Sequence, residues 1–138
     1  AAAGPRARNP VLPIVAASLW LAGPANWPLW RSLAALPELQ SPRGAAFALA
    51  LGLMLAALTA ALLGLLAWRA TLKPAIALLL VVAAVAAHYM GTYGVVIDPT
   101  MIVNALGTDA REVRDLLDAR LLVSLALLAG LPLWWLRR

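Results

Sequence analysis

Apolar residues fill most of this chain in four long runs, and short polar stretches separate the runs. The runs lie at about residues 11–30, 45–68, 74–90 and 121–136. The second run has 24 residues without a charge. As a helix it would be about 36 Å long, enough to cross a hydrocarbon core of about 30 Å. The pattern predicts an all-α fold, a polytopic membrane helix bundle with four spans.

The first run, "VLPIVAASLWLAGPANWPLW", contains Pro13, Pro24 and Pro28 and is predicted to form an irregular span. Proline removes a backbone donor, but membrane helices tolerate it where neighbouring groups satisfy the freed carbonyls. Tryptophan favours the membrane–water interface. We therefore expect interface anchors in the tryptophans near the span ends, which are Trp20, Trp27, Trp30, Trp68, Trp134 and Trp135.

Composition supports a membrane protein and excludes several other classes. The chain is 64% hydrophobic and 12% charged, whereas average soluble domains have about 25% charged residues. It has no cysteine and one histidine, which excludes disulfides, thiolate metal sites and multi-histidine sites within it. Its net charge is +5, but the basic residues stand in small groups beside the apolar runs. They are therefore interpreted as membrane-flanking anchors, and no nucleic-acid partner is expected.

The distribution of charge predicts the orientation of the four spans. One side of the membrane would receive Arg6, Arg8, Arg69, Lys73, Arg137 and Arg138. The other would receive five arginines and all six acids. Basic residues at termini and in short loops favour the cytoplasm. We expect residues 1–10 to form a cytoplasmic N-terminal segment, residues 11–138 the transmembrane domain, and residues 97–120 a periplasmic segment.

Residues 97–120 form the only long polar stretch and carry five of the six acids. Asp98, followed by a proline, has the signature of a helix start. Gly107 is a predicted stop or kink. Thr108 or Asp109 would then cap a second helix. The spacing predicts an amphipathic helix pair between the third and fourth spans.

Asn104, Thr108 and Glu112 in this stretch follow each other at intervals of four residues. In an unbroken helix they lie on one face. An amide, a hydroxyl and a carboxylate together could bind a ligand with hydrogen-bond donors and a positive charge, of which an ammonium is the simplest. On spacing alone, a solvated helix face with one cap is the better explanation.

Three polar residues inside the spans are given structural interpretations. His88, near the outer end of the third span, is expected to face the bundle or the interface with one hydrogen bond. A proton or metal role is the alternative, because ionisable groups in membranes are often functional. Thr59 and Ser124 are expected to bond to their own helix backbone.

The stretch "YMGTYGVVIDPTMIVNALGTDAREVRDLL" resembles the end of the membrane domain of the lipid A phosphoethanolamine transferases. These are inner-membrane enzymes of Gram-negative bacteria that confer polymyxin resistance and belong to the alkaline-phosphatase and sulfatase-like superfamily. The resemblance also includes "NWPLWR", "LKP" and "LPLWWLRR" and so extends over nearly the whole chain. It implies that Asn104, Thr108 and Glu112 bind the headgroup of the phosphatidylethanolamine donor.

This sequence departs from the family pattern at three positions. Gly91 stands where the family often has Asp, Gly107 where Glu is usual, and Ala110 where Pro is frequent. A glycine inside a helix costs about 1 kcal/mol relative to alanine. Gly107 therefore affects how Asn104 and Glu112 are placed relative to each other.

The resemblance further implies a soluble catalytic domain with zinc and a threonine nucleophile, which moves phosphoethanolamine to a lipid A phosphate. None of that domain lies in these 138 residues, so the chain is expected to hold no cofactor and to be inactive alone. Its expected partners are phosphatidylethanolamine, lipid A and the bilayer. The alternatives are a related transferase with another glycolipid acceptor, or a small stand-alone membrane scaffold.

Overall fold

The structure is a computed structural model that describes residues 9–68, 70–94, 100, 103, 107 and 117–138. Within these residues every regular element is helical, which confirms the predicted all-α class. The elements are α1 (Val11–Ala22), the 3₁₀ turn η1 (Pro24–Asn26), α2 (Trp27–Ala34), the 3₁₀ turn η2 (Pro37–Gln40), α3 (Pro42–Leu65), α4 (Leu72–Tyr93), α7 (Ala119–Leu125), the π-helical turn η3 (Ala126–Gly130) and α8 (Leu131–Arg137).

Among the described residues, three helices are long and apolar enough to cross a membrane. They are α3, α4 and the continuous helix Ala119–Arg137, which joins α7, η3 and α8. These helices correspond to the second, third and fourth predicted runs. The predicted count of four spans is not confirmed, because the first run, residues 11–30, is divided between α1 and α2 and the turn between them.

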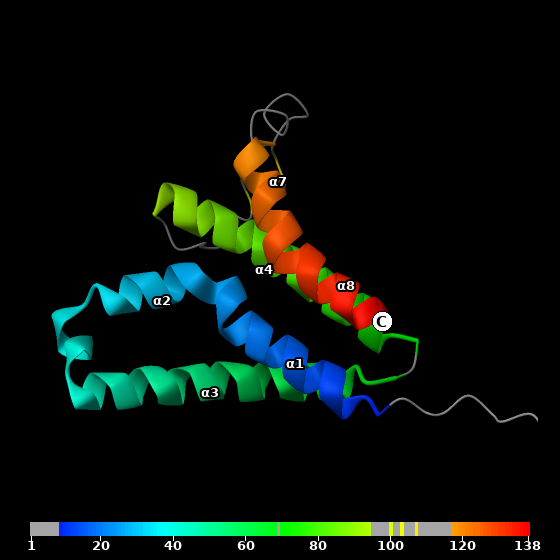
Figure 1. Cartoon of the computed structure of the whole chain (residues 1–138), viewed down its shortest axis with the longest axis horizontal. Coiled ribbons are helices and arrows are strands. Elements are labelled where there is room, and N and C mark those ends of the chain that lie inside the picture. The colour runs from blue at the N-terminus through cyan, green and yellow to red at the C-terminus, as the bar shows by residue number, and fades with distance from the viewer. Residues whose placement is uncertain (1–8, 69, 95–99, 101–102, 104–106, 108–116) are drawn as a thin grey trace, which may run out of the picture.

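The break in the first run follows from Gly23 and the proline after it. Proline has no N–H to continue the α-helical ladder. Beyond the break, the N–H of Asn26 donates to the carbonyl of Gly23, at 2.9 Å, in a 3₁₀ turn. The carbonyl of Ala22 instead accepts from the indole Nε1 of Trp30, at 2.7 Å. In Figure 1, α1 lies beside the C-terminal half of α3, and α2 continues at a distance from α3; both run in the opposite direction to α3.

The last span contains a proline that α1 compensates. Pro132 has no N–H, so the carbonyl of Leu128, four residues earlier, lacks its α-helical donor. The indole Nε1 of Trp20 donates to this carbonyl at 2.8 Å. Directly before the proline the helix widens into the π-helical turn η3, a common way for a helix to accommodate a local irregularity. The first run is thereby tied to the last span.

The buried core is small and centred on the first half of α4. Ile76, Leu80 and Ala84 of α4 are fully buried, together with Leu63 of α3. Many large apolar side chains on the outer faces are exposed, most evidently along α3. Such faces suit a protein whose surroundings are lipid, where exposed apolar surface carries no penalty.

Candidate functional site

The predicted site residues Asn104, Thr108 and Glu112 lie outside the residues that the structure describes. The same holds for most of the predicted periplasmic segment 97–120, so the predicted helix pair stays a prediction. Within this segment, the N–H of Gly107 donates to the carbonyl of Val103 at 3.1 Å, and Gly107 lies in a turn. The structure also describes the two helix ends that flank the segment, the end of α4 and the start of α7.

The first flank is the C-terminal end of α4, which closes at Gly94. Gly94 has φ 64° and lies in the left-handed region, where glycine carries no steric penalty. Its N–H donates to the carbonyl of Met90 at 3.0 Å. The ring of Tyr93 stacks on Tyr89, with ring centroids 6.0 Å apart, and Tyr89 contacts His88 edge to face. The last two turns of α4 therefore carry a row of aromatic rings that leads to the segment.

The second flank is the start of α7. The Asp118 carboxylate accepts the backbone N–H of Arg120 at 2.9 Å and caps the helix. Capping by aspartate is typically worth about 1 kcal/mol compared with alanine, so it fixes where the last span begins. The segment is thus bounded by a glycine cap on one side and an aspartate cap on the other.

His88 and Ser124 join the two flanking helices. The Nδ1 of His88 lies 3.4 Å from the Oγ of Ser124, a long hydrogen-bond distance, and His88 is buried. This confirms that His88 faces the bundle with one polar contact. For Ser124 the predicted bond to its own backbone is wrong, whereas Thr59 does donate to the carbonyl of Leu55 at 2.8 Å. The His88–Ser124 pair could not be predicted from the sequence, because helical periodicity does not relate residues on different helices.

α2 packs against the end of α4 through Trp27 and Gly91. A Cβ at Gly91 would lie 2.8 Å from the Cη2 of Trp27 and closer still to Cζ2. Glycine at this position therefore lets the indole rest on the helix. The Arg31 guanidinium lies 5.8 Å from the centroid of the same indole. Trp27 thus has a packing role that its predicted interface position did not include.

A family model for phosphoethanolamine transferase EptA/EptB matches residues 55–138, which include both flanks and the segment between them. The chain belongs to this family. It is 34% identical over 124 residues to phosphatidylethanolamine transferase Mcr-2 of Escherichia coli, a match that covers 90% of this chain and 23% of that protein. It is 45% identical over 65 residues to phosphatidylethanolamine transferase Mcr-1 of Escherichia coli, covering 47% of this chain and 12% of that protein.

The chain therefore spans less than a quarter of the length of these phosphoethanolamine transferase relatives. No solved structure matches the chain. The family match confirms the resemblance found in the sequence at the level of a phosphoethanolamine transferase membrane domain.

The described part of this transferase domain does not fit a zinc centre. No three His, Cys, Asp or Glu side chains of the described residues lie close enough together to hold a metal ion. Zinc in proteins is bound by three or four such ligands. The described residues offer two capped helix ends, a contact between His88 and Ser124 that links the two helices, and the packing of Trp27 on the end of α4.

Proposed function

We propose that this chain is the N-terminal membrane domain of an enzyme that transfers phosphoethanolamine from phosphatidylethanolamine to a lipid A phosphate. The observation that carries the proposal is the family match over residues 55–138, which includes all three predicted site residues. The two relatives that are named phosphatidylethanolamine transferases support it. The zinc and the nucleophilic threonine belong, in this proposal, to a part of the enzyme outside this chain, and the chain alone is inactive.

In this proposal the domain anchors the enzyme and holds the donor headgroup. The Glu112 carboxylate pairs with the ethanolamine ammonium, and the Asn104 amide and Thr108 hydroxyl add hydrogen bonds. The capped ends of α4 and α7 support the proposal because they give the segment two fixed points. A headgroup held in one orientation meets the nucleophile with less loss of translational and rotational entropy, which lowers the activation free energy of transfer.

The proposed topology has four crossings in the inner membrane of a Gram-negative bacterium. Residues 11–34 cross as one bent span, since α1 and α2 both run in the opposite direction to α3 (Figure 1). Both ends of the chain face the cytoplasm, and residues 97–120 face the periplasm. The basic residues at the termini and in the loop between α3 and α4 support this orientation.

Mass spectrometry of lipid A from cells that express the full-length protein tests the proposal. We expect a gain of phosphoethanolamine on lipid A and a loss of at least about tenfold of that product with Glu112→Ala, as for the loss of one charge-assisted contact. Glu38→Ala is the matched control, because it removes an exposed carboxylate of η2 and should leave the product unchanged. Immunoblotting of membrane fractions checks that the amounts of both variants are equal.

The other outcomes each contradict one part of the proposal. A gain that survives simultaneous change of Asn104, Thr108 and Glu112 to alanine would keep the enzyme and reject the binding site. Phosphoethanolamine on a different glycolipid would keep the transferase but reject lipid A as its acceptor. No gain on any glycolipid would favour a membrane scaffold.

A further inference from the structure

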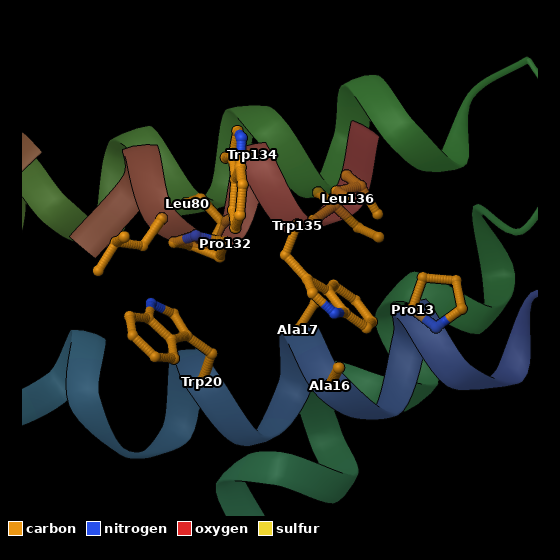
Figure 2. A pocket seen from close by; sticks show the side chains of 11 residues that line it. Pro13, Ala16, Ala17, Trp20, Leu80, Pro132, Trp134, Trp135 and Leu136 are labelled. Atoms are coloured by element: carbon orange, nitrogen blue, oxygen red, sulfur yellow. The ribbon is translucent and has the colours of Figure 1, made fainter. Parts of the chain in front are cut away.

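A cavity of about 340 Å³ lies between α1, α4 and α8, at the opposite end of α4 from the candidate site. Figure 2 shows Trp20 of α1 and Trp135 of α8 on two sides of the gap between these helices, with Trp135 extending toward α1. Ile76 and Leu80, in the first half of α4, close the cavity on a third side. The lining also includes Pro13 and Ala16 of α1 and Pro132 and Trp134 of α8.

The walls of the cavity are held in place by contacts outside it. The Trp20 indole is fixed by its bond to the carbonyl of Leu128, and Pro132 sets the course of α8 beyond the π-helical turn. On α1, beside Trp20, the cavity is lined by the small side chains of Ala16 and Ala17. Small side chains on α1 and the fixed position of Trp20 therefore both contribute to the space.

The size and lining of the cavity suit hydrocarbon. Every lining residue is Pro, Ala, Ile, Leu or Trp, so the cavity offers almost no polar partners for water. Apolar cavities of about 150 Å³ stay dry and bind ligands of the size of benzene. This cavity is more than twice that volume and lies in the usual range for small-molecule sites, about 300–1,000 Å³. A segment of a lipid acyl chain fits these properties.

The end of the molecule beside the cavity is positively charged. The Arg138 guanidinium lies 3.9 Å from the ring centroid of Trp134, which lines the cavity. Arg137 is exposed on the same turn of α8, and Lys73 is exposed at the start of α4. The acids that the structure describes, Glu38 and Asp118, precede α3 and α7 and lie at the far ends of these helices (Figure 1). Basic groups beside pockets between membrane helices attract anionic lipid headgroups.

We propose that the cavity binds one acyl chain of an anionic glycerophospholipid, whose phosphate lies beside Arg137 and Arg138. The lipid would fill the space between the first and last spans and hold α1 against α8. This site is separate from the donor headgroup site and does not rest on the proposed function.

Photo-crosslinking with the full-length protein in nanodiscs tests the proposal. The probes are phosphatidylglycerol and phosphatidylcholine that carry the same diazirine-labelled acyl chain, and mass spectrometry locates the labelled peptides. We expect label on peptides that contain Trp20 or Trp135, with phosphatidylglycerol labelling about thirtyfold more than phosphatidylcholine, since each of the two arginines contributes about 1 kcal/mol. Equal labelling by the two lipids, or label spread over the outer face of α3, would overturn the proposal.

Two pairs of variants sharpen the result. Ala16→Phe fills the cavity and should lower cavity labelling by both lipids at least threefold, whereas Ala57→Phe, on an exposed position of α3, should not. Arg137→Gln should reduce the preference for phosphatidylglycerol about fivefold, whereas Arg43→Gln, at the start of α3, should leave it unchanged. Arg137 is exposed, so its substitution should not disturb packing. It therefore tests the contact with the lipid phosphate even if Ala16→Phe destabilises the bundle. An unchanged preference in Arg137→Gln would refute the headgroup contact.

Discussion

At the residue scale, two tryptophans satisfy backbone carbonyls that lack their usual helical donor. Trp20 donates to Leu128, whose donor is missing because of Pro132, and Trp30 donates to Ala22 at the break after α1. An unsatisfied polar group costs more in lipid than in water, because no solvent replaces the partner. The prolines of this chain are therefore tolerated through specific contacts between distant segments.

Trp20→Phe is predicted to lower the free energy of unfolding by about 1–3 kcal/mol, the usual cost of leaving a buried acceptor without a partner. The phenyl ring retains most of the apolar contact, so the lost hydrogen bond accounts for most of the change. Unfolding of the purified protein in detergent, followed by tryptophan fluorescence against denaturant, measures it. Trp68→Phe is the matched control, because Trp68 is 79% exposed and should change stability by less than about 0.5 kcal/mol.

A double-mutant cycle identifies the cause. Pro132→Ala restores a backbone N–H four residues after Leu128, which then has its own helical donor. We expect Trp20→Phe to cost at least about 1 kcal/mol less in the Pro132→Ala background. An equal cost in both backgrounds would show that packing of the indole, and not its bond to the carbonyl, carries the effect.

At the scale of elements, Trp27 and Gly91 determine how α2 packs on α4. Gly91→Ala adds a methyl group where the indole lies, and such overpacking typically costs about 1–3 kcal/mol. Alanine also favours the helix by about 1 kcal/mol over glycine. The net prediction is a loss of stability of up to about 2 kcal/mol, measured by the same unfolding assay.

Two comparisons test this explanation. Gly64→Ala, on α3, meets no atom within 4 Å and should stabilise the protein by up to about 1 kcal/mol. In a Trp27→Ala background, Gly91→Ala should likewise become stabilising, because the indole that it contacts is gone. If Gly91→Ala stabilised the unmodified protein as much as Gly64→Ala does, the explanation that Trp27 packs directly on Gly91 would be refuted.

The long apolar runs were predictable, whereas the contacts between them were not. A run such as residues 45–68 has to form a helix in lipid because its backbone groups have no other partner, and α3 follows. The pairing of His88 with Ser124 and of Trp27 with Gly91 depends on helix packing, which a single sequence does not encode by spacing. The prolines predicted an irregular first run, but the bond from Trp30 that satisfies the carbonyl of Ala22 at the break was not predictable from spacing.

The candidate site was predicted in a different way from the fold. Spacing alone left Asn104, Thr108 and Glu112 as a plausible solvated face, and only the family resemblance assigned them a ligand. The family match supports the resemblance, but these three residues lie outside the described part of the chain. The structure adds the two helix ends between which these residues lie in the chain, the C-terminal end of α4 and the start of α7.

At the scale of the whole molecule, the charge distribution predicts which loops face the periplasm. The chain has no cysteine, so a single introduced cysteine reports its own position against a parent protein without it. Ala35, after α2, and Ala70, before α4, are both exposed and lie at opposite ends of α3. In cells with a permeabilised outer membrane, we expect a membrane-impermeant maleimide to label Ala35→Cys. Ala70→Cys should be labelled only after the inner membrane is opened.

Each departure from this labelling pattern has a distinct meaning. Reversed labelling would invert the orientation and place residues 97–120 in the cytoplasm, where they could not meet a periplasmic acceptor. Labelling of both cysteines from one side would mean that α3 does not cross the membrane. A third variant, Asn9→Cys, tests the number of spans. If residues 11–34 cross as one bent span, its cysteine should be labelled only after the inner membrane is opened, as for Ala70→Cys. If α1 and α2 remain on one side, it should be labelled without that step, as for Ala35→Cys. The same experiment would then assign Arg137 and Arg138, beside the cavity, and the candidate site at the other end of α4 to opposite leaflets.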